Sequence, residues 1–317
     1  MVYHTLITML VLSFLFIYWQ KVPNFLKIFW GYFLLRAVFM AYGPFIIPDY
    51  AKGIAPYYWW VSAQDAFQIL LIPILVLQID TKKLIKALQI ICAVNLVFAI
   101  LTYKTRGAWY TGNTMDLAIC SFFFLSWGHR AGTILNLFAV IFLGGSTAKL
   151  MMVSQLLAKY KKYWFSTLPL VLLAFFITRK YAPTFFTPSD RFTIWQYSMS
   201  FWEANSSKLF GEGIGAYSQI GPVLGEANKV HTYMWMHNDW LQVMFDTGFI
   251  GIGLSLALFF ASLWKTRREP ILLGQVLSFG VMMMFYSPLR LIIGQALLCV
   301  LLKQIWSKTW HISDLKI

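Results

Sequence analysis

Long apolar runs separated by short polar turns dominate the pattern of this 317-residue chain. A run of about 15 to 25 apolar residues can cross a bilayer as a helix. We find eleven candidate runs, near residues 2–19, 25–47, 57–79, 84–103, 114–128, 131–147, 148–160, 163–178, 239–264, 271–287 and 289–306. The pattern therefore predicts an all-α polytopic integral membrane protein with about 11 transmembrane helices. No soluble domain, heptad or longer repeat interrupts it, so we interpret 1–317 as a single membrane domain.

Two parts of this pattern of apolar runs are less regular. The seventh run follows Gly144-Gly145-Ser146-Thr147 so closely that the sixth and seventh runs are expected to form a tight hairpin, or one of them a half-span. The first run lacks Lys or Arg before it and a small-residue cleavage site after it, so we expect a first span and not a removable signal.

One long polar segment, 179–238, separates the eighth and ninth runs. Ser189 or Asp190 can cap a helix there, and Phe192, Trp195, Met199 and Trp202 recur at helical spacing. We therefore expect an amphipathic helix whose apolar stripe lies on the membrane surface or packs on the spans. Because this is the one extended piece free to form an irregular, water-accessible surface, any chemistry is expected here.

Basic residues fall mostly on one side when the spans are alternated. That side collects Lys21, Lys27, Lys82, Lys83, Lys86, Arg130, Lys159, Lys161, Lys162, Lys265, Arg267, Arg268, Lys303, Lys308 and Lys316. The positive-inside bias makes this side the cytoplasm. The large loop 179–238 then lies outside, together with the 104–113 loop and the turn at 287–290.

Composition supports the membrane class and argues against nucleic acid as a partner. Hydrophobic residues make up 59% of the chain and charged residues 12%, against about 25% charged in soluble domains. The net charge of +14 is spread over short loops without a dense Lys/Arg stripe, which is usual for a multi-span protein. Cys92, Cys120 and Cys299 lie singly in apolar runs and fit neither disulfides nor a metal site.

Several arginines remain outside against the bias, and an anionic ligand would explain them. They are Arg106, Arg179, Arg191 and Arg290. Arg191 is the most informative, since a cation in a first helical turn opposes the helix dipole unless an anion is bound there. For Arg106 and Arg290, on short outer turns, anchoring to lipid phosphates is an equal alternative.

His237 is the best candidate base. The helix of the ninth run is expected to begin near Asn238 or Asp239, which places His237 at its N-terminus, where the dipole favours a neutral imidazole. The alternative is an interfacial histidine that satisfies a backbone group. The outer cations and the neighbouring polar residues favour catalysis. Asp246 is expected to orient a partner and not to react.

Two further patterns favour structural interpretations. Arg36 and Asp65, inside neighbouring spans, are expected to pair with each other. Gly211, Gly213 and Gly215 alternate, which is a weak nucleotide signal and predicts a turn that allows close backbone approach.

Missing motifs narrow the mechanism. The chain has no Asp-x-Asp, no metal-ligand cluster, no Gly-x-Ser-x-Gly and no Walker loop. We therefore expect no metal and no cofactor, and expect arginines and backbone N–H groups to meet any leaving-group charge.

The stretch from His237-Asn238 through Leu241-Gln242 and Asp246 to Gly248 and Gly251 resembles the O-antigen ligase and O-antigen polymerase superfamily. Arg191 with Trp195, the glycines from Gly211 to Gly215, and Thr111 to Ala118 are similar as well. The chain differs from the family in two motifs. It has Ser146-Thr147-Ala148 where Ser-Arg-Gly is common, and Asp246 where Glu is usual.

The resemblance implies a membrane glycosyltransferase in the bacterial inner membrane whose site faces the periplasm. The donor would be a glycan on undecaprenyl diphosphate and the acceptor a lipid or glycan hydroxyl. Arg191 would bind the diphosphate with help from Arg106, Arg179 or Arg290, and His237 would accept the hydroxyl proton. Asn238 and Asp246 would complete the substrate-binding set.

Other functions remain open at this point. Ligase, polymerase and protein O-oligosaccharyltransferase share these residues and differ in acceptor. A transporter or lipid-glycan flippase is the rival from another class, and it predicts repeated halves with broken spans. A scaffold subunit whose outer loop binds a partner is a third possibility.

Overall fold

The computed structural model describes residues 146–160, 190–205, 207–217, 236–285, 288–290 and 292–306, together with scattered positions within 24–36, 80–97, 140 and 220–224. Five α-helices lie in these ranges: α7 (Ser146–Lys159), α9 (Asp190–Asn205), α11 (Asp239–Thr266), α12 (Pro270–Phe285) and α13 (Ile292–Trp306). A 3₁₀ turn, η5 (Pro288–Arg290), joins α12 to α13. No strand occurs among the described residues, which agrees with the all-α prediction.

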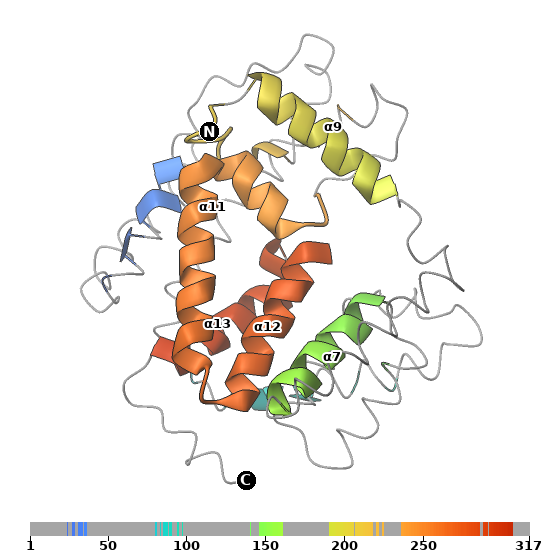
Figure 1. Ribbon diagram of the computed structural model, residues 1–317, viewed down its shortest axis with the longest axis vertical. Coiled ribbons are helices and arrows are strands. Elements are labelled where there is room, and N and C mark those ends of the chain that lie inside the picture. The colour runs from blue at the N-terminus through green and yellow to red at the C-terminus, as the bar shows by residue number, and fades with distance from the viewer. Residues whose placement is uncertain are drawn as a thin grey trace.

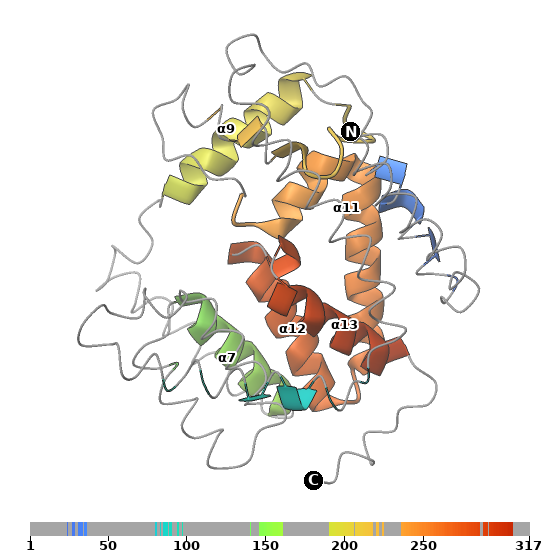
Figure 2. The same ribbon diagram turned by 180° about the vertical axis from the view of Figure 1, so that it is seen from behind.

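The C-terminal helices form the packed core of the described part. In both views α11 and α12 are joined by a tight turn at one end, α13 lies between them, and α7 runs along the outer side of α12 (Figures 1 and 2). Small residues let α7 and α12 approach closely: a Cβ on Gly274 would lie 3.1 Å from the Cα of Gln155. Ser278 also donates a hydrogen bond of 2.9 Å to the carbonyl of Met151.

α11 is not one straight helix. Gly248 has φ 65° and ψ −165°, so the helix breaks there. We call residues 239–247 the short arm and residues 249–266 the long arm; they diverge from the break in Figure 1. The apolar run predicted near 239–264 is helical, and the sequence pattern gave no indication of the break, where Gly248 adopts a positive φ that ends the short arm.

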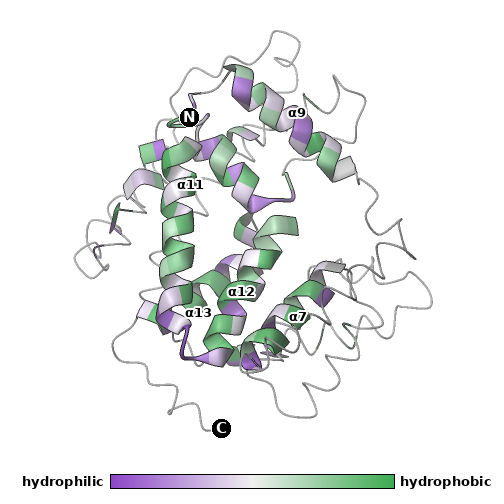
Figure 3. Ribbon diagram, viewed as in Figure 1, coloured by the Kyte–Doolittle hydropathy of each residue, from purple (hydrophilic) through white to green (hydrophobic). Residues whose placement is uncertain are grey.

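α11 is the one described helix that is long and apolar enough to cross a membrane, by length and composition. Its long arm alone would extend about 27 Å, close to the hydrocarbon thickness of a bilayer. α12 is apolar and shorter. Figure 3 shows the long arm and α12 as mostly hydrophobic, with polar residues at the turn between them.

The last three predicted runs correspond to α11, α12 and α13, and the seventh to α7. α7 has 14 residues, which gives about 21 Å of helix, so its short length fits the half-span alternative. The other predicted runs lie wholly or largely outside the described residues. The total of about 11 spans therefore stays a prediction.

α9 confirms the helix predicted after Ser189, and its packed face is rotated from the predicted stripe. Ile194, Ser198 and Trp202 are buried, whereas Phe192 is 56% exposed. These buried positions recur every four residues, as expected for a helix that lies against a neighbour. α9 lies across the end of the molecule where α11 breaks (Figure 1).

Candidate functional site

A glycine-rich loop, residues 207–217, hydrogen-bonds to the backbone at the break in α11. The N–H groups of Glu212 and Gly213 donate to the carbonyls of Phe245 and Asp246, at 3.0 and 2.7 Å. On the other side of the break, the N–H groups of Phe249 and Ile250 donate to the carbonyls of Lys208 and Leu209, at 2.8 and 3.2 Å. Backbone groups that a continuous helix would pair internally are thus paired with the loop.

Two glycines make this contact possible. Gly211 and Gly248 both have positive φ, 68° and 65°. A Cβ on Gly248 would lie 2.4 Å from the carbonyl of Leu209, and a Cβ on Gly211 would lie 2.5 Å from the nitrogen of Gly248. Close backbone approach, predicted from the alternating glycines, is therefore confirmed. Its partner is the broken helix.

Asp246 holds the far half of the loop. Its side chain is 1% exposed, and its two carboxylate oxygens accept hydrogen bonds from the N–H groups of Gly215 and Tyr217, at 3.1 and 3.4 Å. A buried carboxylate is stable only when such donors surround it. Asp246 thus positions the loop, and its predicted contact with substrate stays a prediction.

Tyr217 closes the buried side of the loop. Its hydroxyl is hydrogen-bonded to that of Ser198 on α9 at 3.2 Å, and its ring packs edge-on against Phe245 at 5.4 Å. Burial raises the pKa of the Tyr217 phenol to about 12, and the negative charge of Asp246 acts in the same direction, opposed by the Ser198 hydrogen bond. The phenol is therefore held neutral well above ordinary pH.

His237 stands directly before the short arm, as predicted. Asn238 caps the helix, accepting a hydrogen bond from the N–H of Leu241 at 3.1 Å. His237 is partly exposed and has φ 53°, a left-handed conformation that is uncommon for a residue with a side chain. The Gln242 side chain stabilises this turn, because its Oε1 accepts from the N–H of Met236 at 3.2 Å.

Two long-range hydrogen bonds bring other segments to this turn. The indole N–H of Trp195, on α9, donates to the carbonyl of Met236 at 2.6 Å. The N–H of Leu289, in η5, donates to the Asp239 carboxylate at 2.8 Å. Arg191 lies one helical turn before Trp195 and Arg290 directly follows Leu289. The segments that carry both arginines are thus hydrogen-bonded to the His237 turn, and contact of the two guanidiniums with a ligand at this turn stays a prediction.

Some of the remaining predicted residues lie in the described ranges and others do not. Arg106 and Arg179 lie outside the described residues, as does Asp65. Arg36 is described, and its Nη2 donates to the carbonyl of Gly211 at 2.9 Å. The predicted pairing of Arg36 with Asp65 remains untested.

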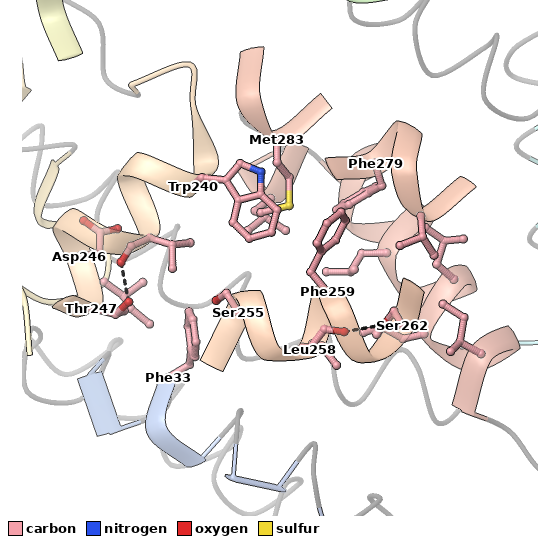
Figure 4. A pocket seen from close by; sticks show the side chains of 18 residues that line it. Phe33, Trp240, Asp246, Thr247, Ser255, Leu258, Phe259, Ser262, Phe279 and Met283 are labelled. Carbon is pink, nitrogen blue, oxygen red and sulfur yellow. Dashed lines mark hydrogen bonds between the residues drawn. The ribbon is translucent and has the colours of Figure 1, made fainter. Parts of the chain in front are cut away.

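A mostly apolar pocket lies between the two arms of α11 and the helices α12 and α13 (Figure 4). The empty space in the pocket and in the solvent at its opening is together about 940 Å³. Asp246 and Thr247 form one end, next to the break, and apolar side chains form most of the rest; Figure 4 labels Phe33, Trp240, Leu258, Phe259, Phe279 and Met283 among them. The pocket thus has polar residues at one end and an apolar lining elsewhere.

Sequence reasoning missed roles for Trp195, Asp239 and Gln242. Asp239 and Gln242 are 1% and 0% exposed, and each fixes a segment of the site through the hydrogen bonds above. The available signal was their polarity at the start of an apolar run, where a polar side chain needs a buried partner. Among the residues that the structure describes, no three His, Cys, Asp or Glu side chains group as metal ligands.

Comparisons with known proteins add no family assignment. No protein-family model matches the chain, and no curated protein matches it significantly.

Proposed function

We propose that this protein is a polytopic glycosyltransferase of a bacterial inner membrane, with its site facing the periplasm. It would move a glycan from undecaprenyl diphosphate to a hydroxyl of a lipid or glycan acceptor, as an O-antigen ligase or polymerase does. His237 would be the base and Arg191 the principal diphosphate ligand. Neither metal nor nucleotide is part of the proposed reaction.

The convergence on the His237 turn carries this proposal. Trp195 and Asp239 tie α9 and η5, the elements that carry Arg191 and Arg290, to the turn of a partly exposed histidine. In our proposal the two guanidiniums bind the anionic leaving group while this base receives the proton of the attacking hydroxyl. These segments are 41 and 50 residues apart along the chain at the two hydrogen bonds.

The proposed reaction is a single displacement. The acceptor oxygen attacks the anomeric carbon of the donor sugar while the His237 imidazole takes the hydroxyl proton. The bond between the anomeric carbon and the diphosphate oxygen breaks, and its electron pair stays on the diphosphate. Arg191, with Arg290, stabilises that charge, and attack opposite the leaving group inverts the anomeric configuration.

The pocket supplies a place for the donor's lipid. Its apolar lining runs from Trp240 to residues near the far end of α13, such as Ile305. An isoprenoid tail would bury apolar surface there, at about 25 cal/mol per Å². Since Trp240 and Leu289 line the pocket and adjoin the His237 turn, we propose that the tail enters the apolar part and the diphosphate remains at that turn.

One observation favours the transporter alternative, because α11 is broken and broken helices form ion sites in transporters. In those proteins the freed backbone groups face the transported ion. Here the carbonyls of Phe245, Asp246 and Thr247 accept hydrogen bonds from Glu212, Gly213 and Tyr32. Because protein groups already donate to these carbonyls, the break does not resemble an ion site. This supports the enzyme proposal.

The test is the variant His237→Asn in proteoliposomes with a lipid-linked glycan donor. Asparagine also adopts the left-handed conformation, so the turn should persist while the base is lost. We expect normal insertion and a loss of transfer of at least about 100-fold, the usual scale of general-base catalysis. Product analysis would separate one transferred glycan, a ligase, from a lengthened chain, a polymerase.

Lys208→Gln is the control, because Lys208 lies on the same loop and contacts Glu203 and Trp202 instead of the His237 turn. Full transfer by His237→Asn would refute the assigned base. Movement of intact lipid-linked glycan across the membrane without glycosidic transfer would favour the flippase alternative.

A further inference from the structure

The N-terminal segment contacts both sides of the break in α11. Tyr32 and Arg36 lie one helical turn apart, so their side chains share a face. The Tyr32 hydroxyl donates to the carbonyl of Thr247, the last residue before the break. The Arg36 guanidinium donates to the carbonyl of Gly211, in the loop that crosses the break. One face of one segment thus holds the short arm and the glycine-rich loop together.

The Tyr32 contact replaces a hydrogen bond that the break removes. In a continuous helix, the carbonyl of Thr247 would accept from the N–H four residues later. The conformation of Gly248 ends that pattern. A buried carbonyl without a donor is costly, and the hydroxyl from the distant segment satisfies it.

Arg36 adds charge to this contact. The carboxylates of Asp246 and Glu212 attract its guanidinium, and Asp246 is 1% exposed. The Arg36 side chain is only partly exposed, and its Nε is buried without a hydrogen bond to the described residues. A half-buried cation in an apolar run is costly enough that a specific role is the default interpretation.

We propose that Tyr32 and Arg36 are positioning residues, a latch that fixes the short arm relative to the glycine-rich loop. The short arm, residues 239–247, would extend about 13 Å from the break, and His237 directly precedes its other end. Loosening the latch would let the arm pivot, and a shift of about 1 Å at a catalytic group can cost about 100-fold in rate. The effect on activity rests on the proposed function, and the effect on local stability does not.

Hydrogen exchange measured by mass spectrometry in nanodiscs tests the latch directly. Arg36→Gln should speed exchange of the amides at 211–217 and 249–250 by about tenfold or more, since a charged hydrogen bond is lost. Tyr32→Phe removes only a hydroxyl and should give about a threefold effect. Arg36→Lys keeps the charge and should recover part of the protection.

The double variant and a matched control sharpen the result. If both residues act as one latch, Arg36→Gln should add less in the Tyr32→Phe background than alone. Lys159→Gln, an exposed change in the last turn of α7 and outside the latch, should leave exchange of these amides unchanged. Where Arg36→Gln does not fold, Tyr32→Phe and Arg36→Lys still provide the comparison.

Kinetics provide the second measurement. We expect kcat to fall in Arg36→Gln with the donor KM unchanged, because the latch residues are proposed to touch no substrate. Unchanged exchange in Tyr32→Phe and in both Arg36 variants would overturn the latch. A raised KM with unchanged kcat would overturn the positioning role. Faster exchange in variants of a protein whose wild type transfers no glycan would leave the latch intact and refute the proposed function.

Discussion

The two arms of α11 belong to one helix in sequence and behave as two kinds of structure. In the short arm the buried residues include Asp239, Gln242 and Asp246, each 1% exposed or less. In the long arm Phe260 and Trp264 are 61% and 69% exposed. Ser255, Ser262 and Thr266 are buried on the long arm as well, but only the short arm buries carboxylates, and only the long arm exposes large apolar side chains.

The difference shows how α11 combines a hydrogen-bonded segment with a long apolar helix. The short arm is held by hydrogen bonds with defined donors and acceptors, so the loss of one donor or acceptor should lower its stability. The buried hydroxyls of the long arm bond within their own helix. This arm meets the core through apolar side chains such as Phe259 and Leu263, and such packing tolerates change as long as volume and pattern persist. A sharp test of this comparison changes one glycine at the break and one glycine in the long arm.

The largest difference should come from glycine to alanine in the two regions. Gly248→Ala would put a Cβ 2.4 Å from the carbonyl of Leu209 at a position with φ 65°. We expect a loss of about 3 kcal/mol or more, measured by unfolding in mixed micelles. Gly253→Ala, with no atom within 4 Å of the added Cβ, should be neutral or stabilising by up to about 1 kcal/mol.

A pH titration should give a smaller effect that is specific to Tyr217 in the glycine-rich loop. Because burial raises the pKa of Tyr217 to about 12, only the unfolded chain loses that proton between about pH 10 and 12. Tyr217 therefore contributes stability that is fully present below about pH 10 and is lost as pH rises towards 12, by about 2 to 3 kcal/mol. The unfolding free energy of wild type should fall more steeply in this window than that of Tyr217→Phe. Parallel curves would contradict the assignment.

The smallest expected effect tests the apolar lining of the pocket. Ser255 lines the pocket and Leu256, the next residue, is 38% exposed. Ser255→Trp should fill the pocket and raise the KM for a long polyprenyl donor about tenfold, through the loss of roughly two buried methylenes, with little effect on a short-chain donor. Leu256→Trp is the matched control. Equal effects on both donors, or equal effects of both variants, would remove the pocket from the proposed mechanism.

Much of the local structure follows from sequence. Apolar runs predicted α11, α12 and α13, and the polar residues at 238 and 239 predicted where α11 begins, because periodicity and capping depend on neighbours within a few residues. The positive φ values of Gly211, Gly213 and Gly215 agree with the predicted turn for the same reason.

The tertiary structure decided how these pieces meet. Arg36 hydrogen-bonds to a residue 175 positions away, and Tyr32 to one 215 positions away. Gly248 has no local signal that distinguishes it from Gly251 and Gly253, and only the loop packed against it explains the break. Such contacts depend on which distant backbone groups are left unpaired after the helices assemble. The periodicity of a sequence does not predict those groups.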